Sequence, residues 1–211
     1  MLSLKGKVAL VTGCGSSGPG WGNGKAIATL FARQGAIVIG VDINLAAAEE
    51  TKKIIEGEGG TCEVASCDVT DLKQVQALVD GIVARHGRLD ILVNNVGQSE
   101  PGGPVEMAPE VWDRQLQLNL TSAYNGCKAA IPVMERQGGG SIVNISSVAG
   151  LRYIGKPQVA YAAAKAALIQ FTRTTAVIHA AKKVRLNCVV PGLIFTPLVT
   201  RLADKYAGGD F

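Results

Sequence analysis

The sequence predicts an α/β protein of the doubly wound, Rossmann-type class, with a mostly parallel sheet and helices on both faces. Short runs of β-type residues alternate with longer segments in which apolar residues recur every three or four positions. The short runs are continuously apolar, as in Val-Ala-Leu-Val at 8–11, which is typical of strands that are buried on both faces. Strand-helix alternation of this length implies right-handed crossovers and a parallel sheet.

Six strands and five helices follow from this pattern. The strands are expected at residues 8–11, 36–41, 62–65, 91–93, 142–145 and 184–190. The helices are expected at residues 25–34, 46–56, 72–85, 109–136 and 159–180. With 211 residues, of which 47% are hydrophobic, the chain is expected to bury one core and to form a single domain over residues 1–211.

The composition argues against several classes of function. The net charge is +4, but the basic residues are scattered and the densest group is Lys182, Lys183 and Arg185, so no nucleic-acid partner is expected. There is no run of eighteen apolar residues and no signal-like stretch at the N-terminus, so we expect a cytoplasmic protein that does not bind membranes. Five scattered cysteines and two histidines predict reduced core thiols and no metal site.

A glycine-rich segment joins the first strand to the first helix, with six glycines in residues 12–24. Glycine lets the backbone approach a pyrophosphate, and a helix N-terminus offers N–H donors and a positive dipole. A mobile loop is the plainer alternative. We expect Gly13, Gly22, Asn23 and Gly24 to bind the phosphates of a dinucleotide, while Gly18 and Gly20 offer a competing alignment.

Acidic residues end the second and third strands. Asp42 stands where a carboxylate accepts hydrogen bonds from adenosine ribose hydroxyls, although a strand-end cap is the alternative. A ribose 2'-phosphate about 4 Å away would be repelled by roughly 4 kcal/mol per unit charge at an effective dielectric of about 20. Because the glycine loop holds no Lys or Arg, NAD is expected and NADP is less favoured. Asp68, with Val69, either bonds the adenine amino group or caps the helix that starts near Asp71.

Tyr161 and Lys165 stand four residues apart in a helix-forming stretch that follows Ser146-Ser147. Positions i and i+4 share a helix face, so a phenol lies beside an ammonium group. The ammonium is expected to lower the pKa of Tyr161 and to make it a general acid and base near neutral pH. A Tyr-x-x-x-Lys pair also occurs by chance, but its combination with the glycine loop, Asp42 and Ser147 is what a dinucleotide-dependent oxidoreductase needs.

With the glycine loop, Asp42, Asn94-Asn95-Val96-Gly97, Ser147 and Tyr161-x-x-x-Lys165 in this order, the chain resembles the classical branch of the short-chain dehydrogenase/reductase family. The resemblance covers essentially the whole chain. It implies a catalytic set of Asn119, Ser147, Tyr161 and Lys165. It implies that Tyr161 and Lys165 also contact the cofactor, together with Asn95, Val96, Gly97, Pro191, Gly192, Ile194 and Thr196, the residues after 190 lying near the nicotinamide.

The resemblance also implies a role for each catalytic residue. Tyr161 exchanges the hydroxyl proton of the substrate while a hydride moves to or from nicotinamide, and Ser147 orients the substrate oxygen. Lys165 lowers the tyrosine pKa and holds the nicotinamide ribose. Asn119 positions a water that links Lys165 to solvent, unless it simply bonds the backbone at a helix kink.

Three departures from the family pattern are visible. Eight residues rather than three separate Gly13 from Gly22, and Val96 replaces an alanine. The chain stops at Phe211, before the last strand and helix of the family. We expect either an incomplete sequence, which is the favoured alternative, or a truncated form that lacks both elements.

The sequence therefore predicts an NAD-dependent oxidoreductase that acts on a small-molecule secondary alcohol or ketone. The alternatives are an NADPH-dependent carbonyl reductase and a non-catalytic dinucleotide-binding protein on the same fold. The helices at 109–136 and 159–180 carry more apolar surface than one sheet face can cover. By analogy with the family's four-helix interface, a homodimer or homotetramer is expected.

Overall fold

The computed structural model describes residues 3–206, and the chain forms two compact units. The first unit contains the residues up to Asp68 and those from Leu193 onward, and the second contains Val69–Gly192.

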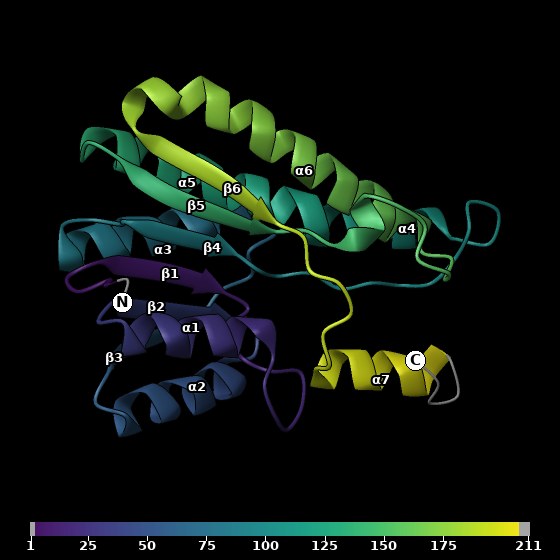
Figure 1. Cartoon of the computed structure of the whole chain (residues 1–211), viewed down its shortest axis with the longest axis horizontal. Helices are drawn as coiled ribbons and strands as arrows, with labels where there is room; N and C mark the ends of the chain where they lie inside the picture. Colours follow the sequence, from purple (N-terminus) through teal and green to yellow (C-terminus); the bar gives the residue numbers. More distant parts are fainter. Residues whose placement is uncertain (1–2, 207–211) are drawn as a thin grey trace. The chain divides into compact units, whose positions relative to one another are not determined.

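Three parallel strands form the sheet of the first unit in the order β3-β2-β1 (Figure 1). They are β1 (Val8–Thr12), β2 (Ile37–Asp42) and β3 (Thr61–Ser66). The helices of this unit are α1 (Asn23–Arg33), α2 (Leu45–Gly57) and α7 (Pro197–Tyr206). All five residues of β1 are buried, which explains its unbroken apolar sequence. Helix α1 contacts β1 and β2, whereas α2 contacts β2 and β3.

The second unit repeats this pattern with three parallel strands in the order β4-β5-β6. They are β4 (Ile91–Asn94), β5 (Gly140–Ile145) and β6 (Val184–Val189). Its α-helices are α3 (Leu72–His86), α4 (Pro109–Leu116), α5 (Ser122–Arg136) and α6 (Val159–His179). Two 3₁₀ turns, η2 (Val148–Gly150) and η3 (Ala180–Lys182), precede and follow α6. Figure 1 shows α6 running alongside β6, and the two elements are in contact.

The single helix expected at 109–136 is wrong in one respect, because a π-helical turn, η1 (Gln117–Thr121), separates α4 from α5. Two side chains bond the backbone at this place. The hydroxyl of Ser122 donates to the carbonyl of Leu118 at 2.6 Å, and the amide of Asn119 donates to the carbonyl of Gln115 at 2.9 Å. Such side-chain bonds compete with the regular helical ladder, and π-turns often mark functional sites.

The predicted fold class is confirmed: every strand pair within a unit is parallel, and helices alternate with the strands. Apart from the divided helix, the expected boundaries differ from the observed ones by two residues at most. Helix α7 is absent from the expectation, although Thr196-Pro197 is a recognisable helix start. The hydroxyl of Thr196 accepts a hydrogen bond from the N–H of Val199 at 3.4 Å, as a helix cap does.

Three further findings concern residues 3–206 as a whole. None of the helices described there is long and apolar enough to cross a membrane. In the same range, no group of three or more His, Cys, Asp and Glu side chains is arranged to hold a metal ion. All five cysteines are free thiols, four of them buried and Cys188 half-buried.

Candidate active site

The two serines that follow β5 have different surroundings. Ser146 is buried, and its hydroxyl donates a 2.8 Å hydrogen bond to the carbonyl of Lys165. The backbone of Ser147 is extended, and its hydroxyl accepts a 3.2 Å hydrogen bond from the N–H of Ala149 at the start of η2. The side chain of Ser147 also lowers the pKa of Tyr161. Of the two serines, Ser147 is therefore the one whose side chain acts on the tyrosine.

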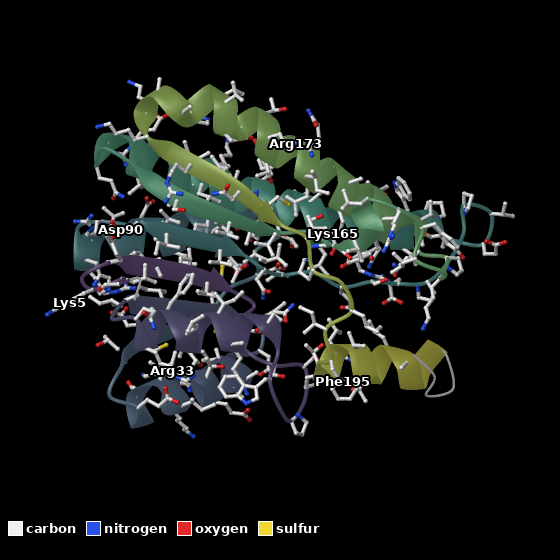
Figure 2. The ribbon with its side chains drawn as sticks, in the orientation of Figure 1. Lys5, Arg33, Asp90, Lys165, Arg173 and Phe195 are labelled. Carbon is white, nitrogen blue, oxygen red and sulfur yellow. The ribbon has the colours of Figure 1, made fainter. Side chains whose placement is uncertain are left out.

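Lys165 lies on α6 (Figure 2). Its ammonium group is beside Tyr161. The distance from its Nζ to the centroid of the Tyr161 ring is 5.6 Å. The same Nζ donates a 2.9 Å hydrogen bond to the carbonyl of Ile145, and the residue is only 3% exposed. The spacing of four residues thus brings Tyr161 and Lys165 together, as the sequence predicts.

The expected lowering of the Tyr161 pKa is wrong for this structure. Burial raises the pKa of Tyr161, and the Ser147 side chain lowers it by a smaller amount. Burial also lowers the pKa of Lys165 to about 8, against a smaller and opposite effect of the neighbouring Cys188. Both changes have one cause, since removal from water disfavours the charged form of each group. The spacing of the pair in the sequence contains no information about this desolvation.

Gly97 ends the turn after β4 and lies against both Asn119 and Lys165. A Cβ atom at this position would stand 2.8 Å from Oδ1 of Asn119 and 2.9 Å from Nζ of Lys165. A side chain at residue 97 would therefore displace both polar groups. The turn, the π-helical segment and α6 meet at this point.

The side chain of Asn119 is buried and bonded to the backbone on two sides. Its amide donates to the carbonyls of Gln98 and Gln115, at 2.8 and 2.9 Å, and its oxygen accepts from the N–H of Gln98 at 3.1 Å. This confirms the alternative in which Asn119 bonds the backbone at a break in a long helix. A role in holding water remains a prediction.

A chain of buried amides lies beneath these groups and was not predicted. The amide of Asn94 donates to Oδ1 of Asn144 at 2.8 Å, and the amide of Asn144 donates to Oγ1 of Thr172 at 2.9 Å. These bonds connect β4, β5 and α6. A polar residue inside the apolar run Ile142-Val143-Asn144-Ile145 is the signal that could have drawn attention to Asn144.

In the first unit, the carboxylate of Asp42 is fixed at the end of β2. Its Oδ2 accepts a hydrogen bond from the N–H of Gly15 and its Oδ1 accepts one from the N–H of Asn44, both at 3.0 Å. A Cβ atom on Gly15 would stand 2.7 Å from Cβ of Ala47, so the glycine loop lies directly against the start of α2. Gly15 is missing from the predicted set, although the spacing Gly13-x-Gly15 could have indicated it.

The start of α1 suits an anionic group. Gly22 is the N-cap and has no side chain to bond the first N–H groups of the helix. Ser16 lies nearby, because a Cβ on Gly22 would stand 3.7 Å from its Oγ. That hydroxyl is buried and has no hydrogen-bond partner among the described residues. Unpaired helix N–H donors together with an orphaned hydroxyl match the phosphates of a dinucleotide.

The two alignments of the glycine loop use glycines with different surroundings. Asn23 begins α1 and Gly24 is buried in its first turn, as the alignment through Gly22 requires. Gly18 and Gly20 instead lie near Pro197, the first residue of α7. A Cβ atom added to Gly18 would stand 3.4 Å from Cβ of Pro197, and one added to Gly20 would stand 3.4 Å from its Cγ.

Two other predicted positions are clarified by local contacts. Asp71 is the N-cap of α3, and its Oδ1 accepts a hydrogen bond from the N–H of Lys73 at 2.8 Å, so Asp68 is not the cap. The carbonyl of Pro191 accepts a hydrogen bond from the N–H of Val148 at 3.0 Å, which joins the stretch after β6 to the turn that begins at Ser147.

The predicted site residues are divided between the two units. All four members of the predicted catalytic set lie in the second unit. The predicted cofactor contacts of the first unit are Gly13, Gly22, Asn23, Gly24, Asp42, Asp68, Ile194 and Thr196, and those of the second are Val69, Asn95, Val96, Gly97, Tyr161, Lys165, Pro191 and Gly192.

Comparison with known proteins identifies the family. The family model described as short chain dehydrogenase matches residues 7–207. The chain is 40% identical over 204 residues to the 3-oxoacyl-(acyl-carrier-protein) reductase FabG of Thermotoga maritima, covering 97% of this chain and 80% of that protein. It is 36% identical over 205 residues to the D-threitol dehydrogenase of Mycolicibacterium smegmatis, covering 97% of this chain and 76% of that protein.

Solved structures agree with this result. A short-chain dehydrogenase/reductase crystal structure from Burkholderia xenovorans is 56% identical, with a TM-score of 0.93 over 96% of this chain and 80% of that one. A 7α-hydroxysteroid dehydrogenase in complex with NADH and 7-oxo glycochenodeoxycholic acid is 35% identical, with a TM-score of 0.88 over 95% of this chain and 76% of that one. The chain belongs to the short-chain dehydrogenase/reductase family, whose members are NAD(P)-dependent oxidoreductases that act on CH–OH and keto groups.

Proposed function

We propose that this protein transfers a hydride between a secondary alcohol or ketone and NAD, with Tyr161 as the general acid and base. The observation that carries the proposal is the group formed by Tyr161, Ser147 and Lys165. The Ser147 side chain lowers the pKa of the phenol, and the Lys165 ammonium lies 5.6 Å from the phenol ring centroid. These are the groups needed to orient a carbonyl oxygen and to exchange a proton with it.

Tyr161 would give its proton to the substrate oxygen during reduction and take it back during oxidation. The raised pKa keeps Tyr161 in the phenol form at neutral pH, which suits the donor role. The hydroxyl of Ser147 accepts from Ala149 and still has its own hydrogen to donate to the substrate oxygen. When bound, the nicotinamide supplies or accepts the hydride.

Lys165 would hold the nicotinamide ribose and favour loss of the phenol proton. An ammonium group has three N–H donors, and the hydrogen bond to the Ile145 carbonyl fixes its direction. With a pKa of about 8, Lys165 is mostly protonated at neutral pH. A cation at this distance stabilises the phenolate that forms when Tyr161 gives up its proton. The side chains of Asn119 and Lys165 both lie against Gly97. Asn119 would help to hold a water on the path of the proton.

The residues after β1, β2 and β3 would hold the adenosine half of the cofactor. Gly13 and the residues from Gly22 to Gly24 would bind the pyrophosphate at the start of α1, and the orphaned hydroxyl of Ser16 would add a donor. Asp68 and Val69 would bond the adenine. In the second unit, the proposed contacts of the nicotinamide half are Asn95, Val96, Gly97, Pro191 and Gly192. In the first unit, the proposed nicotinamide contacts are Ile194 and Thr196.

Asp42 supports NAD over NADP. Two backbone N–H groups hold its carboxylate in place, and a fixed negative charge at the end of β2 opposes a ribose 2'-phosphate. The nearby Lys25 is buried and paired with Glu50 at 3.6 Å, which reduces its ability to compensate that repulsion.

A homodimer or homotetramer is the proposed assembly. Val177 and Ile178 on α6 are 79% and 65% exposed, and a second copy of the chain would cover such apolar side chains. Sedimentation velocity on the purified protein would give the assembly, and a monomer at micromolar concentration would contradict this part of the proposal.

The experiment that tests the function is cofactor titration followed by turnover. NAD and NADP binding are measured first, and the absorbance of reduced nicotinamide is then followed across a panel of secondary alcohols and ketones. We expect tighter binding of NAD and turnover with at least one substrate class. Turnover with NADP alone would favour the carbonyl reductase alternative, and dinucleotide binding without turnover on any substrate would favour a non-catalytic protein.

A further inference from the structure

We propose that Ser146 and Gly150 are positioning residues that fix the main chain of Lys165, and through it the spacing between Ser147 and Tyr161. The proposal rests on the proposed function, because it concerns how the same site is assembled. Neither residue belongs to the catalytic set that the family pattern implies.

Ser146 holds Lys165 from the end of β5. Its hydroxyl donates a 2.8 Å hydrogen bond to the carbonyl of Lys165, and its own N–H donates to the carbonyl of Val189 at 2.8 Å. The side chain is buried, so the bond to the helix carbonyl does not compete with bulk water. The donor of this hydroxyl is already used, which leaves Ser146 unsuited to orient a substrate and suited to hold a helix.

Gly150, at the other end of the η2 turn, packs closely against the peptide group between Lys165 and Ala166. A Cβ atom on Gly150 would stand 2.7 Å from the carbonyl carbon of Lys165 and 2.8 Å from the nitrogen of Ala166. The φ angle of Gly150 is not in the left-handed region, so close approach rather than backbone conformation requires glycine here. The atoms that would clash are backbone atoms of α6, which cannot turn aside as a flexible side chain would.

These contacts act on one residue of α6 from a single short segment. The segment from Ile145 to Gly150 contacts Lys165 at its ammonium through Ile145, at its carbonyl through Ser146, and at its peptide through Gly150. Ser147 begins the η2 turn that ends at Gly150, so its place is set by the same contacts.

The spacing of the catalytic groups follows from this arrangement. Tyr161 stands about one helical turn before Lys165 on the same face of α6. A shift of the Lys165 peptide relative to the turn would therefore change the distance between the Ser147 hydroxyl and the Tyr161 phenol. A misplacement of about 1 Å in a catalytic site lowers rates by about a hundredfold.

The test compares Gly150→Ala with Gly57→Ala. Each variant adds one methyl group, but a Cβ on Gly57 meets no atom within 4 Å, so it is the matched control. We expect Gly150→Ala to lower kcat by about tenfold to a hundredfold while the Kd for NAD changes by less than about threefold. Gly57→Ala should leave both constants unchanged. Equal kcat values in the two folded variants would overturn the proposal.

A second pair of variants covers the case in which Gly150→Ala does not fold. Ser146→Ala removes the bond to the Lys165 carbonyl, and Ser146→Thr keeps a hydroxyl at the same position. We expect Ser146→Ala to lower kcat and Ser146→Thr to recover most of it, with circular dichroism unchanged in both. Loss of thermal stability with an unchanged kcat in Ser146→Ala would show a merely structural role.

A titration of Tyr161 separates this proposal from the proposed function, because it needs no turnover. The chain has four tyrosines, so carbon-13 labelled tyrosine gives a simple NMR spectrum in which Tyr161→Phe assigns the signal. Since the Ser147 side chain lowers the pKa of Tyr161, separating the two groups should raise that pKa in Gly150→Ala and in Ser146→Ala. An unchanged tyrosine pKa in both variants would contradict the positioning role, even if the wild-type protein turned over no substrate.

Discussion

The ammonium group of Lys165 donates a 2.9 Å hydrogen bond to the carbonyl of Ile145 at a place where the lysine is almost completely buried. The buried charge has few groups to compensate it, and burial therefore lowers the pKa of Lys165 from 10.5 to about 8. This relationship connects the candidate site to the pH dependence of the protein's stability.

We expect stability to respond to Lys165 between pH 8 and pH 10.5. In this range the unfolded chain still binds the lysine proton and the folded chain has lost it, so the contribution of Lys165 to folding becomes more favourable as pH rises. The full change is about 3 kcal/mol. Urea unfolding of the wild type and Lys165→Met at several pH values would measure it. The free energy of unfolding of the wild type should rise relative to that of the variant as pH rises from 8 to 10.5. A difference between the two that does not change with pH would contradict the lowered pKa.

A second pH effect has the opposite sign and comes from buried thiols. Burial raises the pKa of Cys127 to about 12, well above the ordinary value of 9.0. Above pH 9 the unfolded thiol loses its proton and the folded one keeps it, so folding becomes less favourable as pH rises. Cys127→Ala should reduce the loss of stability between pH 9 and pH 11 by up to about 1.4 kcal/mol per pH unit. Between pH 6 and pH 8 the difference between variant and wild type should stay constant, which provides the internal control.

Gly97→Ala should disturb the site without touching the sheet. The added methyl would stand within 3 Å of both the Asn119 oxygen and the Lys165 nitrogen, so both groups must move. We expect kcat/KM to fall about a hundredfold while the circular dichroism spectrum stays the same. Gly57→Ala again serves as the control in steady-state kinetics. Full activity in Gly97→Ala would mean that neither group needs its observed position.

Asp42→Ala should shift cofactor preference toward NADP. Loss of the carboxylate removes the repulsion of a 2'-phosphate and the hydrogen bonds that it offers to ribose hydroxyls. We expect the ratio of kcat/KM for NADP to that for NAD to rise by about tenfold or more, which corresponds to about 1.4 kcal/mol. Fluorescence titration with both reduced cofactors would give the same ratio for binding. An unchanged ratio would show that Asp42 does not determine the preference between NAD and NADP.

Much of the fold could be predicted because burial on both faces leaves a direct trace in the sequence. Strands such as Val8–Thr12 are buried along their whole length, so they appear as unbroken apolar runs. The break in the helix at Gln117–Thr121 left no such trace. The segment contains neither Gly nor Pro, and its π-turn goes with bonds from Asn119 and Ser122 to the backbone that no periodicity reveals.

The proximity of Tyr161 and Lys165 was predictable, whereas the environment of this pair was not. The spacing of Tyr161 and Lys165 was enough to place them on one helix face. The direction of the tyrosine pKa was not predictable, because it depends on how much water the surrounding elements exclude. The supporting roles of Asn144, Ser146 and Gly150 depend in the same way on contacts between elements far apart in the chain.

The proposed function can be tested most directly by comparing Tyr161→Phe with the wild type in turnover and in NAD binding. The variant keeps the aromatic ring beside Lys165 and removes only the oxygen that exchanges the proton. We expect kcat to fall by about a hundredfold to ten-thousandfold while the Kd for NAD changes by less than about threefold. Turnover in Tyr161→Phe at the wild-type rate would contradict the assignment of Tyr161 as the general acid and base.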